Sequence, residues 1–362
     1  MQQIKSIFLP RVNDENPYIK QLISHLEQLD IQVELPSASS SRTFFFPEVV
    51  LHKKADIIHL QWLHPFFINS NKVVNLLKLL IFILQLIVLK IIGKKIVWTV
   101  HNLKNHENQY IILDRIYSTV VAQLANAIIT HCKAAKEEVA QEFSIKNKDK
   151  IFVVPHGNYI ECYKNNIEKT IARESLGLKD SSLIFLFLGT IRPYKGVFEL
   201  IDKFNQIYSD NSDQIQLVIA GKVYNDSQEI TDILREKIAN YPRIKFFPGF
   251  VPDDEIQVYM NASDVVIFPY RDILTSGAVV LAMSFGRACI APRKGCIGEV
   301  LDDEGAFLYQ IDEENGLIKA MNSAVEKHHQ LLSMGQHNFE LAQQYNWKYI
   351  GKLTADVYGY CL

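Results

Sequence analysis

The chain has 362 residues, of which 48% are hydrophobic and 22% charged, with 16 glycines and 12 prolines; this composition excludes a disordered tail or a repeat array and allows two domains of roughly 150 to 180 residues. A net charge of -2 and a pI of about 6.6 exclude the basic field typical of nucleic-acid-binding proteins, so we expect no nucleic-acid partner. The five cysteines are scattered and form no CxxC pair, which speaks against a disulfide framework or a zinc site and favours a reducing, cytoplasmic compartment.

The first half of the chain alternates short apolar runs with helix-like stretches. The helix-like stretches include residues 17–29, 113–125 and 133–143. The apolar runs, typical of buried parallel strands, lie at residues 6–10, 56–61, 95–100, 127–131 and 150–155. This alternation predicts a βα repeat.

Residues 73–92, VVNLLKLLIFILQLIVLKII, form an apolar stretch about as long as a bilayer span. Lys78 and Lys90 lie inside it, and their cost in a bilayer core disfavours a transmembrane helix. Two alternatives stay open. The stretch is either a helix buried against the sheet, or a helix whose apolar face rests in the membrane interface while its lysines meet anionic head groups.

The second half of the chain restarts the alternation after the polar passage 156–182. Its apolar runs lie at residues 183–190, 215–221, 243–250, 264–270, 288–292 and 306–310. The pattern predicts two doubly wound α/β domains with parallel sheets. We expect an amino-terminal domain at 1–165, a linker at 166–182, a carboxyl-terminal domain at 183–340, and a helix at 341–362 that crosses back to the first domain.

The stretch LFLGTIRPYKG places two cations at the end of an apolar strand. Gly189 ends the run, Arg192 and Lys195 follow, and a helix-like pattern starts near Gly196. Ligands of open parallel sheets bind beyond the carboxyl ends of the strands, where helix amides also favour anions. The loop therefore predicts a diphosphate site, with solvated turn charges as the plain alternative.

Six motifs follow one another in order: GTIRPYKG, LVIAGK, FPGFVPDDEI, ASDVVIFPY, SGAVVLAMSFGRACIAP and GCIGEV. Together they resemble the carboxyl-terminal half of glycosyltransferase family 4, whose members have the GT-B fold. The resemblance covers residues 183–305 well. It implies that Arg192 and Lys195 hold the diphosphate of a nucleotide sugar, that Phe250 and Val251 line the base, and that no cofactor other than this co-substrate is needed.

The chain departs from the family pattern after ASDVVIFPY, where two glutamates are expected at the sugar and ribose. Ile273 and Leu281 occupy those positions, and neither can make charge-assisted hydrogen bonds. The resemblance leaves other candidates near the donor: Asp272 and Glu299 for sugar or ribose, and Ser276 and Gly277 for the phosphates. Asp272 as a turn residue, Ser276 and Gly277 as a helix N-cap, and Glu299 as a helix-start charge are the structural alternatives.

In the first half, the resemblance points to catalytic and acceptor residues at strand ends. His101 follows the strand 95–100 and is expected to act on the leaving phosphate or the acceptor hydroxyl, with Glu107 as the candidate base. Asn16, Tyr18 and Trp62 are candidates for acceptor contact. A plain helix cap explains Asn16 equally well, and core packing explains Trp62.

The predicted function is a glycosyltransferase that moves a hexose from a GDP-mannose or UDP-glucose type donor to a saccharide or polyprenyl-linked acceptor in surface polysaccharide or exopolysaccharide biosynthesis. Arg192 and Lys195 would neutralise the leaving diphosphate, so no metal is expected. The expected location is cytoplasmic, on the inner face of the cytoplasmic membrane if the 73–92 helix is interfacial. A nucleotide-sugar epimerase or hydrolase and a degenerate, non-catalytic GT-B subunit remain as alternatives.

Overall fold

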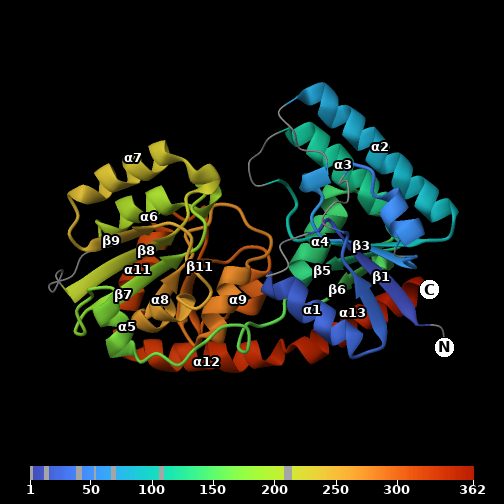
Figure 1. Cartoon of the computed structure of the whole chain (residues 1–362). Coiled ribbons are helices and arrows are strands. Elements are labelled where there is room, and N and C mark those ends of the chain that lie inside the picture. Colours follow the sequence, from blue (N-terminus) through green and yellow to red (C-terminus); the bar gives the residue numbers. More distant parts are fainter. Residues whose placement is uncertain are drawn as a thin grey trace. The chain divides into compact units, whose positions relative to one another are not determined.

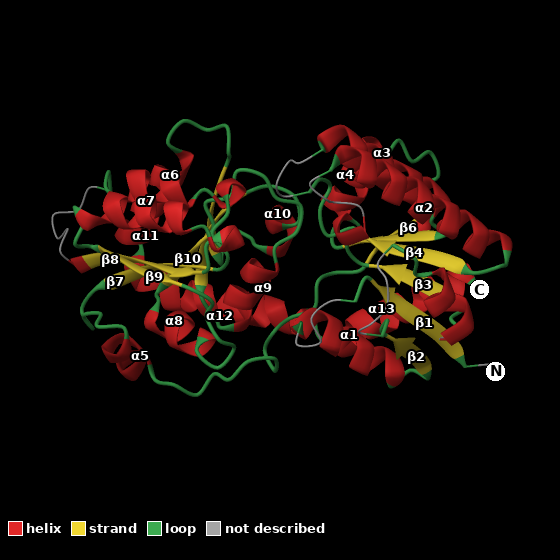
Figure 2. Ribbon diagram, turned by 45° about the horizontal axis from the view of Figure 1, so that its top comes forward, coloured by secondary structure: helices red, strands yellow, loops and turns green. Residues whose placement is uncertain are grey.

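The computed structural model describes residues 3–11, 16–37, 43–52, 54–66, 71–105, 110–207 and 214–362. The chain divides into two compact units. Met1–Gly157 with Tyr345–Leu362 make the amino-terminal unit, and Asn158–Gln344 make the carboxyl-terminal unit. Each unit holds a six-stranded parallel sheet with helices on both faces (Figures 1 and 2). This arrangement confirms the predicted α/β class with two Rossmann-like domains.

The sheet of the amino-terminal unit has the order β2-β1-β3-β4-β5-β6. The order reverses between β1 and β3, the place where open α/β sheets bind ligands. Its strands are β1 (Ile4–Leu9), β2 (Ile31–Glu34), β3 (Ile57–Leu60), β4 (Lys95–Thr99), β5 (Ala127–Thr130) and β6 (Ile151–Val153). One face carries α1 (Pro17–Glu27) and α13 (Trp347–Cys361); the other carries α2 (Lys72–Ile91), α3 (Ile111–Leu124) and α4 (Lys133–Glu142) (Figure 2).

Helix α1 shows how the sequence sets these elements. Asn16 caps its first turn by accepting a hydrogen bond from the backbone N–H of Ile19. Tyr18, Ile19, Leu22 and Leu26 are buried at helical spacing, so one apolar stripe faces the sheet and α13.

The sheet of the carboxyl-terminal unit has the order β12-β11-β10-β7-β8-β9, which reverses between β7 and β10. Strand β7 reads LIFLFL, a continuous apolar run of the kind that both faces of a covered parallel sheet require. The strands are β7 (Leu183–Leu188), β8 (Ile215–Gly221), β9 (Ile244–Pro248), β10 (Val265–Ile267), β11 (Ala288–Pro292) and β12 (Ala306–Tyr309). The helices are α5 (Lys169–Ser175), α6 (Val197–Phe204), α7 (Gln228–Ala239), α8 (Ile256–Ala262), α9 (Gly277–Ser284), α10 (Ile297–Val300), α11 (Gly316–Glu326) and α12 (Leu331–Gln344).

Two segments are organised differently from the expectation. The stretch 166–182, expected as a linker, contains α5, which packs on α8 within the carboxyl-terminal unit. Arg173 of α5 is buried because its guanidinium binds the carboxylate of Asp264 at 2.7 Å. The expected single helix 341–362 is the end of α12 followed by α13, which belongs to the amino-terminal unit and packs on α1.

Candidate functional site

The reversal of strand order in the carboxyl-terminal unit brings two loops together. One loop leaves β7 at Gly189 and carries Arg192 and Lys195; the other leaves β10 toward Pro269. A Cβ atom added at Gly196 would lie 2.0 Å from the carbonyl oxygen of Pro269, and Gly196 has φ 67°. Only glycine therefore allows these two loops to approach as they do.

The two predicted cations have no acidic partner among the residues that the structure describes. The guanidinium of Arg192 lies 4.0 Å above the ring centre of Tyr224, a cation–π contact. The ammonium of Lys195 lies 5.9 Å from the ring centre of Tyr270, and a Cβ added at Gly189 would sit 3.3 Å from it. Within the described part of the chain, neither cation forms an ion pair with a carboxylate.

The other cations that follow strands of the same sheet are neutralised. Lys222, after β8, binds Asp226 at 2.8 Å. Arg271, after β10, binds Glu199 at 3.1 Å, and Lys294, after β11, binds Asp272, also at 3.1 Å. Arg192 and Lys195 thus stand out as the pair of positive charges left for an external anion.

Burial lowers the pKa of Lys195, and a bound anion would raise it again. Desolvation, and next to it the charge of Arg192, lowers the pKa of Lys195 to about 8. A bound diphosphate would favour the charged ammonium and raise this pKa again.

A cavity of about 310 Å³ opens beside this loop in the carboxyl-terminal unit. Gly189 belongs to its wall, as do Gly277, Phe250 and Val251, so four residues predicted for the donor line one cavity. Gly277 is the first residue of α9, and Ser276 caps that helix, its hydroxyl accepting a hydrogen bond from the N–H of Val279. The cap role accounts for Ser276, and the first two residues of α9, Gly277 and Ala278, line the cavity.

The two carboxylates predicted near the donor lie outside this cavity. Asp272 pairs with Lys294, and its side chain is 68% exposed. Glu299 lies exposed in the short helix α10. Neither belongs to the cavity wall, and Ile273 and Leu274, which follow Asp272, are buried.

Sequence reasoning missed two aromatic residues of the cavity wall. Tyr159 and Tyr163, whose ring centres are 5.8 Å apart, both line the cavity. They belong to the polar passage HGNYIECYKNN, which carries no periodic apolar pattern. Their spacing of four residues was the only signal in the sequence, and aromatic rings suit a planar base.

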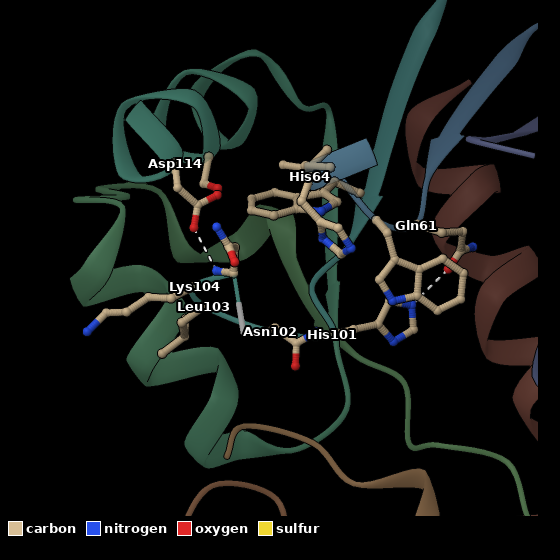
Figure 3. Close-up of a pocket in the computed structure, with 12 residues that line it drawn as sticks. Gln61, His64, His101, Asn102, Leu103, Lys104 and Asp114 are labelled. Atoms are coloured by element: carbon tan, nitrogen blue, oxygen red, sulfur yellow. Dashed lines mark hydrogen bonds between the residues drawn. The ribbon is translucent and has the colours of Figure 1, made fainter. Parts of the chain in front are cut away.

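In the amino-terminal unit, His101 lines a small polar cavity of about 30 Å³ (Figure 3). Gln61 and His101 lie on one side and Asp114 on the other. Asp114 accepts a hydrogen bond of 2.7 Å from the backbone N–H of Asn105, and burial raises its pKa. The volume suits a water molecule but not a sugar ring.

A chain of hydrogen bonds fixes the protonation of His101. His131 donates from Nδ1 to the carbonyl of Val154 at 2.9 Å, so its Nε2 accepts from His101 Nδ1 at 3.2 Å. The remaining lone pair of a neutral His101, on Nε2, lies 3.0 Å from the side-chain oxygen Oε1 of Gln61, and two acceptors cannot pair. A neutral His101 therefore requires the Gln61 amide to be turned over, which also gives the buried Nε2 of Gln61 a partner.

The contacts of His101 limit how it could act on a ligand, and its catalytic role stays a prediction. Both of its ring nitrogens have partners inside the unit, and Trp62 stacks on its ring with centres 4.6 Å apart. Burial, followed by the charge of His131, places the pKa of His101 well below its ordinary value. His101 is therefore neutral, and it can bind a ligand only by giving up Gln61.

The other first-half candidates take up structural positions. Asn16 is the cap of α1, and Tyr18 is buried with its ring against His101, His131 and His156. Glu107, the candidate base, lies outside the described residues. Across the described ranges, no group of three or more His, Cys, Asp or Glu side chains is arranged to hold a metal ion.

Comparison with known proteins connects the site to a family. Residues 182–327 match the family described as Glycosyl transferases group 1. GDP-mannose:glycolipid 4-beta-D-mannosyltransferase of Xanthomonas campestris pv. campestris is 26% identical over 309 residues, covering 84% of this chain and 79% of its own.

Solved structures share the fold over the whole chain. Anabaena HepE in complex with UDP and glucose superposes with a TM-score of 0.74 at 18% identity, covering 98% of this chain and 99% of its own. Sucrose-phosphate synthase from Thermosynechococcus elongatus gives a TM-score of 0.77 at 16% identity, covering 99% and 98%. These matches confirm the GT-B fold and the resemblance read from the motifs.

Proposed function

We propose that the protein moves a hexose from a nucleoside-diphosphate sugar to a membrane-associated saccharide acceptor in surface polysaccharide biosynthesis. The match to the group 1 glycosyltransferases and the GT-B fold support a transferase. One observation carries the donor assignment. Arg192 and Lys195 have no acidic partner in the described part of the chain, and they lie at the carboxyl edge of β7 beside a 310 Å³ cavity with an aromatic wall.

The chemistry follows from these charges. When the bond between the sugar and the diphosphate breaks, negative charge builds up on the leaving diphosphate. Arg192, Lys195 and the first amides of α9 would stabilise that charge without rearranging. Two fixed cations supply the charge that a divalent ion supplies in other sites, so we propose that transfer proceeds without a metal.

Two donors are the first to test. The Xanthomonas relative is named for GDP-mannose, and the HepE complex contains UDP. We would measure nucleotide release from GDP-mannose and from UDP-glucose, with and without a detergent extract of lipid-linked saccharides, in the presence of EDTA. The proposal predicts release that depends on the extract, resists EDTA and falls at least about a hundredfold in an Arg192→Ala, Lys195→Ala double variant.

The alternatives give different results in the same assay. Nucleotide release or sugar conversion that needs no extract would favour a hydrolase or an epimerase. Nucleotide binding without turnover of either donor would favour a non-catalytic subunit.

The membrane part of the proposal rests on α2. Residues Val73–Ile91 are long and apolar enough to cross a membrane by length and composition, with mean hydropathy 2.3, yet 28% of that window is buried inside the protein. Phe82, Leu86 and Leu89 pack in the core, whereas the opposite stripe is exposed, including Leu80 at 57% and Leu84 at 60%. A helix with one buried apolar side and one exposed apolar side can lie in the plane of a membrane interface.

Helix α3, which packs beside α2, also exposes apolar residues. These residues are Ile111, Ile112 and Ile116. Lys78 and Lys90 lie on α2 itself, where anionic head groups would meet them. We propose that this α2–α3 face, formed by the exposed apolar residues of the two helices, holds the enzyme at the inner face of the cytoplasmic membrane.

Sedimentation with vesicles tests this surface. A Leu77→Gln, Leu80→Gln, Leu84→Gln variant should lose binding to phosphatidylglycerol vesicles, because each change removes exposed apolar contact. A control variant, Ile171→Gln, Ile233→Gln, Leu332→Gln, changes three exposed apolar residues of the other unit and should bind as wild type does. Wild-type protein that stays in solution with vesicles, or that buries the face in a dimer, would contradict the membrane proposal.

A further inference from the structure

The cavity in the carboxyl-terminal unit has a wall without carboxylates. Its aromatic residues are Tyr159, Tyr163 and Phe250, and its aliphatic side includes Val251, Ile256 and Leu281. Of the residues that line it, only Lys222 is charged, and its ammonium is paired with Asp226 at 2.8 Å.

The cavity lies where the nucleoside of a donor would extend from the diphosphate. Gly189 lines the cavity, and a Cβ added to it would lie 3.3 Å from the ammonium of Lys195; Gly277 places the start of α9 in the same wall. A diphosphate held by Arg192 and Lys195 therefore directs its nucleoside along Leu281 toward Phe250. This step rests on the proposed donor function.

Among the described residues that line the cavity, none offers a ribose a charged acceptor. A carboxylate accepts hydrogen bonds from vicinal hydroxyls and strengthens them by its charge. Without it, each hydroxyl exchanges water for a neutral partner or keeps its water, and the net gain is small. Two carboxylates outside the wall act on lining groups: Asp226 is paired with Lys222, and the charge of Asp253, after burial, raises the pKa of Tyr163. The side chain of Asp253 is exposed.

We infer that this site holds the nucleoside by ring stacking and apolar contact, and that it accepts 2′-deoxy- and 3′-deoxynucleoside diphosphates nearly as well as the ribonucleotides. The substrate class of the donor site is then defined by base and diphosphate, with the ribose hydroxyls contributing little to affinity.

Calorimetric titration with GDP, UDP and their 2′-deoxy and 3′-deoxy analogues tests the inference. For the nucleotide that binds, the dissociation constants of ribo and deoxy forms should differ by less than about threefold. Leu281 lies one helical turn after Gly277 on the same side of α9, so a Leu281→Glu variant places a carboxylate on the wall. This variant should prefer the ribonucleotide by about tenfold or more. Leu281→Gln, equal in shape and uncharged, should show a smaller preference.

The outcomes separate the two proposals. If neither GDP nor UDP binds, the donor function fails and this inference fails with it. If one binds and the wild type rejects its deoxy forms by tenfold or more, the donor function stands and the inference is overturned. Loss of that rejection in an Asp253→Asn variant would then identify Asp253 as the acceptor.

Discussion

The lowered pKa of Lys195 predicts that nucleotide affinity falls steeply at alkaline pH. Burial and Arg192 bring this pKa to about 8 in the free protein. The neutral amine has no charge for the diphosphate, so binding selects the protonated form and raises the pKa of the bound state. A group with pKa near 8 is about three quarters protonated at pH 7.5 and only a few per cent at pH 9.5. We therefore expect the dissociation constant of the preferred nucleoside diphosphate to rise about 20-fold between these values.

Titration calorimetry at several pH values measures the effect, and three variants control it. Lys195→Arg keeps its charge and should bind with almost the same affinity across the range. Lys195→Ala should bind weakly at every pH. Arg192→Ala removes a charge that lowers the lysine pKa, so the midpoint of the wild-type curve should move to higher pH. A wild-type dissociation constant that is equal at pH 7.5 and 9.5 would refute this account of the site.

Two further predictions concern stability. Gly196→Ala should destabilise the carboxyl-terminal unit by roughly 2 kcal/mol or more, because its Cβ would lie 2.0 Å from the carbonyl oxygen of Pro269 and the residue has a left-handed conformation. The control is Gly359→Ala in helix α13, where no atom lies within 4 Å of the added Cβ. This variant should leave the melting temperature unchanged or slightly raised. Acid should unfold the amino-terminal unit, because burial lowers the pKa of His59, His131 and His156 to about 3 or 4. In the unfolded chain these histidines have their ordinary pKa near 6.5, so acid protonates the unfolded state first. The free energy of unfolding present at pH 7 should therefore fall by about 4 kcal/mol per pH unit between pH 6 and 4.5. The three tryptophans (Trp62, Trp98 and Trp347) all lie in this unit, so urea unfolding followed by their fluorescence reports on it alone, and a urea midpoint that does not move between pH 7 and 5 would count against the prediction.

The strands were predictable because a parallel sheet covered on both faces needs continuous apolar runs. The apolar runs at 183–190 and 215–221 predicted strands that match β7 (Leu183–Leu188) and β8 (Ile215–Gly221) closely. The loop between β7 and α6 was predictable for the same reason, since strand ends mark the ligand edge of such a sheet. Gly189 was predicted for the diphosphate from its place at a strand end and Gly277 from the family resemblance, and both line the cavity.

What the sequence could not predict depends on pairing in space. Asp272 forms an ion pair with Lys294. Nothing local in the sequence distinguishes that lysine from Lys195, which has no acidic partner within the described ranges. The partners of His101 come from two other strand ends, at Gln61 and His131, so its closed network is visible only after the sheet is assembled. Helix α2 looked either buried or interfacial because its sequence is apolar all round, and packing decides which stripe is covered.

The most direct test of the donor site is a crystal structure of the protein with the nucleoside diphosphate that it binds most tightly. The account predicts the β-phosphate within hydrogen-bonding distance of Lys195 Nζ and beside Arg192 and the start of α9, with the base against Phe250 in the 310 Å³ cavity. A diphosphate bound away from Arg192 and Lys195, with the cavity empty, would contradict it.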